Sequence, residues 1–514
     1  MSKMQVFIYC LALLSVASFS SSKVINHNLV TKPNIILILV DDQGWGSTSV
    51  PMRSGLKTSA SDFINTPNLE RLAASAVVFS NGYASHPNCS PTRLSIQTGK
   101  TPALLQMTDI IHRNSGLFYE GNKLNPPQHI NGLPFEEITL AELIKIKRPD
   151  YSIAHFGKWH LGNGGPEKHG YDQSDGNTAN AEGDTRADDN PKDIYGITNR
   201  SIAWIQEQVS QNKPFFVQLS HYATHKSIEA KPATIDKIKQ RKSGKRHQSI
   251  TFASMAEDLD EGIGTILDEI EKLKISDNTY IIYLADNGTY PTNNPGNING
   301  PLHGWKASVW EGGIRVPFMI AGPGIKHQYR TTNVVSHDIY PTICEWLNIQ
   351  ELPAGIEGGS LVSQLKSASV QSSISRKHDF LVFHFPHYQL NKGSQPSSAI
   401  IKGDYKLIRF YEEDQYLLFN LNDDMAEMED LKERYPDKFN ELKEDLATYL
   451  SSINAAMPTR NTAYLAEKDP GLKYLPIKEK LLIEPYFVLD EVFVPDMKKK
   501  KVNDMQNKNV PSWN

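Results

Sequence analysis

Runs of large apolar residues alternate with amphipathic segments along the first 350 residues. The runs at 33–40, 215–219 and 279–284 are dominated by Ile, Leu, Val, Phe and Tyr. Such runs are typical of strands that are buried on both faces of a parallel sheet. In the segments 194–210 and 250–273, apolar residues recur at helical spacing, which predicts helices. The alternation predicts an α/β fold with a large, mostly parallel central sheet flanked by helices.

Weaker patterns complete this part of the chain. Shorter strands are predicted at 77–81, 151–156 and 316–321, and helices at 66–74, 139–147 and 337–347. Residues 163–193 are rich in Gly, Asn and Asp without a clear period, which predicts a long surface loop. The basic run 237–247 either forms a solvated face or makes an electrostatic patch for a polyanionic chain.

The pattern changes at about residue 375. Short aromatic strands are predicted at 380–385, 400–402, 405–410 and 416–421, followed by a helix near 437–450. This order predicts a smaller C-terminal α+β domain built on an antiparallel sheet. The predicted division of the chain is a signal peptide at 1–22, a catalytic α/β domain at 23–374, the C-terminal sheet and helix at 375–490, and a basic polar tail at 491–514.

The first 22 residues have the three parts of an export signal. Lys3 supplies the positive start, residues 6–17 the apolar run, and residues 18–22 the small residues of a cleavage zone. The apolar run is shorter than the roughly 18 residues that a membrane span needs. We therefore predict an exported protein without a membrane span, secreted or periplasmic. The two cysteines left after cleavage, Cys89 and Cys344, do not suggest a disulfide framework, so a lysosomal location is less favoured.

The overall charge narrows the choice of partners. The 514 residues carry a formal net charge of −4, with 22% charged and 39% hydrophobic residues. This balance gives no general attraction to nucleic acid, so we expect no nucleic-acid partner. Any binding of an anion must depend on a local site.

Polar residues follow several predicted strands directly. Asp41 and Asp42 come after the first strand, and Asp286 and Asn287 after the run at 279–284. In open α/β sheets, sites form at the carboxyl ends of strands. An Asp pair at such a point can also be an ordinary turn or helix cap.

A reactive side chain is predicted at the start of a short helix in the stretch Cys89-Ser90-Pro91-Thr92-Arg93. Pro91 suits the first helical position and Gly99 suits the exit. A group at this point faces unpaired N–H groups and the positive end of the helix dipole, which favours an anion. Taken alone, a cysteine such as Cys89 is more often a buried structural residue.

This stretch resembles the type I sulfatases of the alkaline phosphatase superfamily, whose Cys-x-Pro-x-Arg core directs oxidation of the cysteine to formylglycine. Three more blocks match the same family in the same order: Asp41-Asp42, Gly157-Lys158-Trp159-His160-Leu161-Gly162, and Gly304-Trp305-Lys306 with Glu311-Gly312-Gly313-Ile314-Arg315-Val316-Pro317. A weaker block, Leu418-Phe419-Asn420-Leu421 with Asp423, Asp424 and Glu427, resembles the family's C-terminal segment.

The resemblance implies a sulfuric ester hydrolase. Its metal would be held by Asp41, Asp42, Asp286, Asn287 and residue 89, with Cys89 converted to 3-oxoalanine (formylglycine) by a maturation enzyme. The all-oxygen ligands favour Ca2+, with Mg2+ as the second choice. The implied catalytic residues are Cys89, Arg93, Lys158, His160, His225 and Lys306. We predict that Cys344 is an unpaired core residue, because pairing it with Cys89 would remove the nucleophile.

Within the resemblance, each residue has an implied role. Arg93, Lys158 and Lys306 would surround the sulfate with positive charge. His160 would deprotonate residue 89, and His225 would protonate the departing alcohol. The family normally carries a proline two positions after this histidine, where the chain has Ser227, so His221 stays open as the alternative.

We expect the substrate to be a sulfated carbohydrate, either a polysaccharide or its oligosaccharides, because an exported chain carries a basic run. Two other functions remain open. One is a phosphodiesterase or phosphonate monoester hydrolase of the same superfamily. The other is a non-catalytic polyanion-binding protein in which Cys89 stays a thiol.

Overall fold

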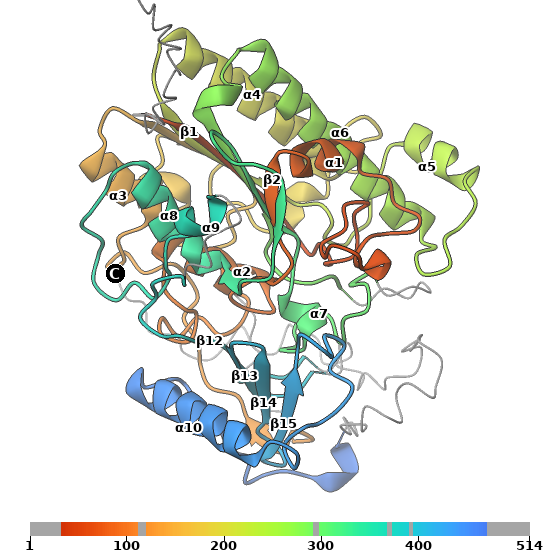
Figure 1. The fold of residues 1–514 in the computed structure, drawn as a ribbon, viewed down its shortest axis with the longest axis vertical. Coiled ribbons are helices and arrows are strands. Elements are labelled where there is room, and N and C mark those ends of the chain that lie inside the picture. Colours follow the sequence, from red (N-terminus) through yellow and green to blue (C-terminus); the bar gives the residue numbers. More distant parts are fainter. Residues whose placement is uncertain (1–31, 112–119, 291–297, 367–372, 390–393, 470–514) are drawn as a thin grey trace, which may run out of the picture.

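The computed structural model describes residues 32–111, 120–290, 298–366, 373–389 and 394–469. A sheet of eight strands crosses the larger part of the molecule (Figure 1). In the described part of the chain its order is β10 (Gln328–Arg330), β2 (Ala76–Phe79), β9 (Phe318–Ala321), β8 (Thr279–Ala285), β1 (Asn34–Val40), β7 (Phe215–His221), β5 (Ser152–Gly157) and β6 (Gln173–Ser174). Only β9 runs antiparallel to its neighbours, so the predicted α/β class and mostly parallel sheet are confirmed.

β1 lies at the centre of this sheet and is buried throughout. It pairs in parallel with β7 on one side and β8 on the other. Alternate side chains point to opposite faces, so Ile36 and Ile38 join one hydrophobic core while Ile35 and Leu37 join the other. A strand with an apolar layer on each side needs apolar residues at successive positions, which is why the run lacks a polar face.

Helices cover both faces of the sheet (Figure 1). The core on one face includes residues of α1 (Pro67–Ala73), α4 (Ile194–Ser210), α5 (Pro232–Lys239) and α6 (Ile250–Lys272). The core on the other includes residues of α2 (Cys89–Thr98), α3 (Leu140–Lys147), α8 (Ile339–Trp346) and α9 (Val362–Leu365). The short helix α7 (Glu311–Ile314) lies towards the second sheet. The predicted helices at 66–74, 139–147, 194–210, 250–273 and 337–347 are therefore present within a few residues of their predicted ends.

A second sheet is formed by β12 (Leu381–Phe385), β13 (Ser397–Lys402), β14 (Tyr405–Phe410) and β15 (Gln415–Asn420), all antiparallel. One face packs on Tyr83, Trp310 and Ile314 of the larger part. The other face is covered by α10 (Pro436–Ser452) through Leu442 and Leu446. The predicted antiparallel sheet with one helix is confirmed. Two further pairs of short strands are β3 (Gly82–Tyr83) with β11 (Val334–Val335) and β4 (Leu124–Asn125) with β16 (Thr459–Arg460).

Some predictions are corrected by the structure or lie outside it. The segment 163–193 is not only a loop, because β6 within it adds an edge strand to the large sheet. The predicted signal peptide and basic tail lie outside the described residues, and the domain boundaries stay predictions. Over the ranges that are described, no helix combines the length and apolarity that a membrane crossing needs. Cys344 is buried and unpaired, as predicted.

Candidate active site

The carboxyl ends of three parallel strands, β1, β7 and β8, meet at one edge of the large sheet. Val40, the last residue of β1, pairs with Ala285 of β8 and with His221 of β7, so these strands end level with one another. Asp41 and Asp42 therefore emerge beside Asp286 and Asn287, although about 245 residues separate them in sequence. The backbone N–H of Asp42 donates to Oδ1 of Asp286 at 3.1 Å. The strand ends thus gather the four predicted metal ligands from the sheet.

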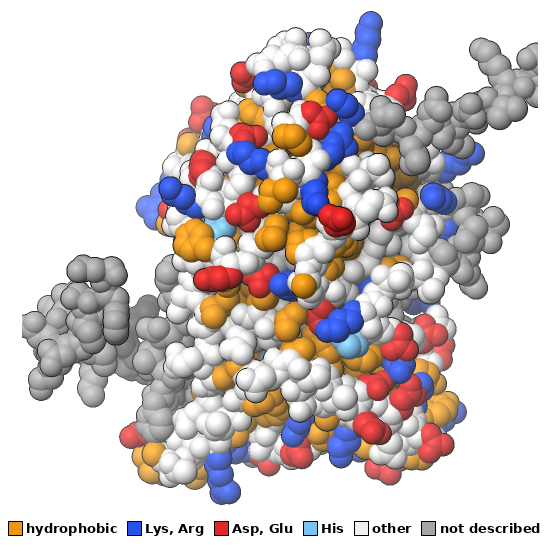
Figure 2. Space-filling model, turned by 90° about the vertical axis from the view of Figure 1, so that its left-hand side faces the viewer, with side chains coloured by type: hydrophobic (Ala, Val, Ile, Leu, Met, Phe, Trp, Pro, Cys, Tyr) orange, Lys and Arg blue, Asp and Glu red, His pale blue; other side chains and the backbone are white. Residues whose placement is uncertain are grey.

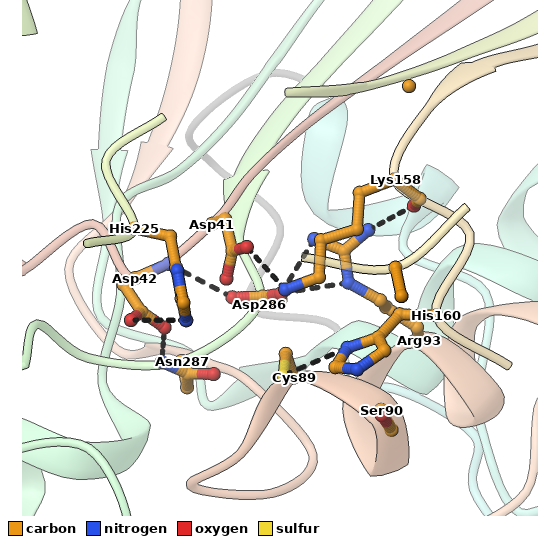
Figure 3. A network of polar contacts seen from close by, with 12 residues as sticks. Asp41, Asp42, Cys89, Ser90, Arg93, Lys158, His160, His225, Asp286 and Asn287 are labelled. Carbon is orange, nitrogen blue, oxygen red and sulfur yellow. Dashed lines mark hydrogen bonds and ion pairs between the residues drawn. The ribbon is translucent and has the colours of Figure 1, made fainter. Parts of the chain in front are cut away.

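Each buried carboxylate of this group contacts a buried cation, and Figure 3 shows Lys158 beside Asp41 and Arg93 beside Asp286. Lys158 Nζ lies 2.5 Å from Asp41 Oδ2, and Arg93 donates to Asp286 Oδ2 through Nε and Nη2 at 2.9 and 2.7 Å. Lys306 Nζ pairs with Asp42 Oδ1. Buried charges persist only when they are paired, so these three acids and three bases depend on each other.

Several oxygens of the same group lack a protein partner. Asp41 Oδ1, Asp42 Oδ2 and Asn287 Oδ1 are buried without a hydrogen bond to any described residue. Ligand atoms of Asp41, Cys89 and Asp286 lie within 4.8 Å of one another. A buried unpaired oxygen is costly, and carboxylate and amide oxygens are what a hard divalent cation prefers. The residues present therefore fit such a cation.

Cys89 is the first residue of α2 and is fully buried. Its Sγ lies 3.3 Å from Nδ1 of His160, which has a left-handed backbone with φ of 58°. The helix exit at Gly99 is confirmed, since this residue is left-handed and its N–H donates to Ser95 O. The position of Pro91 was predicted wrongly: it is the third helical residue, where its missing N–H still leaves no intrahelical bond unmade.

Burial and charge shift the proton equilibria of the site. Burial and the neighbouring Asp41 raise the pKa of Asp286 to about 6, although Arg93 opposes this. Burial also favours the neutral form of Asp41, but Lys158 and the other nearby cations hold its pKa well below the usual value. Burial and Lys158 lower the pKa of His160, which therefore stays a neutral imidazole able to accept a proton.

The structure separates the two candidate histidines. His225 lies at the site, with Nε2 3.8 Å from Asp42 Oδ2. His221 is fully buried, and the charged groups that influence it are Asp193 and Arg200, which belong to the α4 side of the sheet. The strand alternation at the end of β7 therefore turns His221 away, and the loop that follows brings His225 to the site despite the missing proline.

Sequence reasoning missed the support that the second sheet gives to the site. Lys406 Nζ of β14 lies 2.8 Å from Glu311 of α7 and 2.8 Å from Glu427, all three fully buried. The helix α7 also packs closely on Gly288, which directly follows Asp286 and Asn287. A Cβ added to Gly288 would lie 1.8 Å from Gly312 O. Glu311 and Glu427 both lie in sequence blocks already singled out, but nothing in the sequence indicated Lys406 as their partner.

The basic run 237–247 is partly neutralised by neighbouring acids. Arg241 and Lys237 contact Glu257 at 2.5 and 3.6 Å, and Arg246 lies 3.7 Å from Asp62. These contacts favour the solvated-face interpretation of the run. On the face shown in Figure 2, blue and red side chains are likewise interspersed, in keeping with the small net charge of −4.

Comparisons with known proteins agree with this geometry. The family model "Sulfatase" matches residues 33–349, and "N-sulphoglucosamine sulphohydrolase, C-terminal" matches residues 302–456. The chain is 27% identical to a sulfatase of Formosa agariphila over 87% of its own length and 94% of that protein. It is 29% identical to human N-acetylgalactosamine-6-sulfatase over 60% of the chain, but spans only 59% of that relative.

Solved structures share the fold. One is Ps i-CgsB in complex with k-i-k-neocarrahexaose, with a TM-score of 0.64, 21% identity and coverage of 82% of this chain and 93% of the other. Another is the PsFucS1 sulfatase from Pseudoalteromonas sp., with a TM-score of 0.62, 20% identity and coverage of 83% and 91%. At these identities the likeness establishes the arrangement of elements and not the substrate.

Proposed function

Because the chain belongs to the sulfatase family of sulfuric ester hydrolases, we propose that it is an exported enzyme that removes sulfate from a carbohydrate, with the nucleophile made from Cys89. The observation that carries this proposal is the position of Cys89. It begins a helix, contacts His160 at 3.3 Å, and lies within 4.8 Å of Asp41 and Asp286, each of which pairs with a buried cation.

The charges of the site suit an anionic ester once a divalent cation is present. The carboxylates of Asp41, Asp42 and Asp286 are balanced by Lys158, Lys306 and Arg93. A divalent cation would leave the site with a net charge of about +2, which a sulfate ester complements. Each unit-charge contact at 4 Å contributes about 4 kcal/mol at an effective dielectric constant of 20, before desolvation is counted.

We propose that Asp41, Asp42, Asp286, Asn287 and residue 89 would hold this cation, with Ca2+ favoured over Mg2+. The unpartnered oxygens of Asp41, Asp42 and Asn287 support this assignment. Residue 89, matured to formylglycine by a separate enzyme and hydrated by one water to a gem-diol, would supply the hydroxyl that attacks sulfur. The bound cation would supply positive charge beside it.

The chain's own residues would position the ester and move protons. Arg93, Lys158 and Lys306 would hold the sulfuryl oxygens, which carry the negative charge. His160, whose Nδ1 lies 3.3 Å from Sγ, would take the proton of the remaining hydroxyl of residue 89, so that the aldehyde re-forms and the C–O bond to sulfate breaks, releasing sulfate. His225, whose Nε2 lies 3.8 Å from Asp42 Oδ2, would give a proton to the departing alcohol.

The carbohydrate class is supported by the name of one relative. Human N-acetylgalactosamine-6-sulfatase is named for a sugar sulfate. A sulfated polysaccharide or its oligosaccharides would be met outside the cell, in keeping with the predicted export signal.

The test measures the modification of residue 89 and the release of sulfate in the same preparations. The protein is produced with and without a formylglycine-generating enzyme, and the mass of the peptide that contains residue 89 is measured beside sulfate release from sulfated sugars. We expect an aldehyde or its hydrate at residue 89 that rises together with sulfate release. Faster turnover of phosphate esters than of sulfates would favour the phosphodiesterase, and an unmodified thiol with glycan binding in the native source would favour the binding protein.

A further inference from the structure

Asn88 occupies a helix start without doing what Asn usually does there. It is the N-cap residue of α2, directly before Cys89, but its side chain caps no backbone N–H. Nδ2 donates instead to Oδ1 of Asp109 at 3.3 Å, and Oδ1 of Asn88 has no hydrogen-bond partner in the described residues. Since an N-cap Asn normally accepts an N–H of the first turn, this placement needs another explanation.

Gln389 repeats the arrangement from the other part of the molecule. It follows β12 of the second sheet and is fully buried. Its Nε2 donates to the same Oδ1 of Asp109 at 3.3 Å, while its Oε1 has no partner in the part of the chain that is described. Backbone hydrogen bonds of 3.1 and 3.2 Å with Ser394 hold Gln389 in place. Two side-chain amides thus donate to one carboxylate oxygen, and the oxygen of each amide has no partner in the described residues.

The segment that carries Asp109 is fixed against the residues around Cys89. The N–H of Ile111 donates to Oγ of Ser90, the residue directly after Cys89, at 3.4 Å. Thr108 Oγ1 contacts His387 Nε2 at 2.7 Å. Asp109 thus lies between the helix start and the second sheet. Asn88 is one peptide unit, about 3.8 Å between Cα atoms, from residue 89.

A buried amide oxygen without a partner is unfavourable unless a ligand or water supplies a hydrogen-bond donor. The oxygens of Asn88 and Gln389 beside the carboxylate of Asp109 would accept hydrogen bonds and would repel a second anion. We infer that Asn88, Asp109 and Gln389 form a subsite for uncharged hydroxyl groups of the sugar that carries the scissile sulfate. This inference rests on the proposed function, and it selects monosulfated over disulfated sugar rings.

The test measures a ratio of rates in matured protein. Sulfate release is measured from 4-nitrophenyl sulfate, which lacks hydroxyl groups, and from the 4- and 6-sulfates of galactose and N-acetylgalactosamine. In Gln389→Leu we expect the ratio of sugar to aryl kcat/KM to fall about ten-fold, the size expected for one lost hydrogen bond to a buried group. The control Gln208→Leu changes a buried glutamine at the C-terminal end of α4, towards the opposite edge of the sheet, and should leave the ratio unchanged.

Charge selection gives a second readout. We expect galactose 6-sulfate to be turned over faster than galactose 4,6-disulfate, and Asp109→Asn to reduce that preference. A fall of both rates by the same factor in Gln389→Leu, or a preference for the disulfate, would overturn the subsite. Aryl turnover without turnover of any sugar sulfate would overturn it as well. No sulfate release from any of these compounds would instead defeat the proposed function, and the subsite with it.

Discussion

Substituting Glu427 with glutamine is expected to remove a pH-dependent part of the free energy of unfolding. Glu427 and Glu311 share one ammonium group, Lys406 Nζ, at 2.8 Å from each, and all three side chains are fully buried. Glu311 also pairs with Arg315 Nε at 2.5 Å. Two carboxylates that share one cation in a dry environment cannot both ionise easily.

The pKa values of the two acids shift in opposite directions. Burial raises the pKa of Glu427 to about 8 and Glu311 adds to this, while Lys406 opposes it. Burial also acts on Glu311, but Arg315 and Lys406 hold its pKa below the usual value. The folded protein therefore binds a proton on Glu427 more tightly than the unfolded chain does. This stabilisation is complete below the unfolded pKa of 4.5 and is lost as the pH rises through about 8.

The difference between these two pKa values corresponds to about 5 kcal/mol, or about 1.4 kcal/mol per pH unit in the interval. The assay is the thermal midpoint of wild-type protein and Glu427→Gln between pH 5 and pH 9. One kcal/mol shifts the midpoint by about 2–4 °C in a domain of 150–250 residues, and by less in a longer chain. The wild-type midpoint should fall more steeply than that of Glu427→Gln.

Glu429→Gln is the matched control, since this residue lies two positions away and is exposed. Its midpoint should follow the wild-type curve. Parallel curves for wild type and Glu427→Gln would refute the reasoning, because they would mean that Glu427 is ionised in the folded protein across this range.

Three further predictions concern the site. Cys89→Ala should lower sulfate release by about 10³-fold or more with little change in the thermal midpoint, since it removes a nucleophile and few buried atoms; retained activity would exclude residue 89 as the nucleophile. Lys306→Met should lower kcat by about 10²–10³-fold, whereas Lys438→Met, at a partly exposed pair on α10, should not; equal effects would contradict a role for Lys306 at the sulfate. Ca2+ should raise the thermal midpoint of apoprotein, and Asp41→Asn should weaken that shift; a shift of the same size in both would place the ion elsewhere.

Most elements of the fold could be predicted from the chain because their signals are local. The continuous apolar run of β1 indicates a strand with an apolar layer on each face. The helical spacing of apolar residues in 250–273 indicates a helix with one buried face. Each pattern therefore indicates how its own segment is buried. The edge strand β6 could not be found in this way. Its two residues form a strand only because β5 offers an open edge beside them.

In the site, too, some residues could be predicted from the sequence and others only from the tertiary structure. Blocks that resemble the family named Cys89, Asp41 and His160, and the end of a predicted strand named Asp286. The choice of His225 over His221 depended on which way each side chain leaves β7. That direction is set by strand alternation and by the loop that follows, and the residue types at these two positions do not state it.

The sequence by itself determined the kinds of strand and helix, the acids at the strand ends and the cysteine at a helix start, since all of these are encoded within about ten neighbouring residues. Only the tertiary structure decided which charges meet. Lys406 joins Glu311 to Glu427, and Asp109 joins Asn88 to Gln389. The longer contact in each group joins residues 95 and 280 positions apart in the sequence. Buried polar groups accept whichever partner the packing brings within hydrogen-bonding distance, and that partner is fixed by the whole fold.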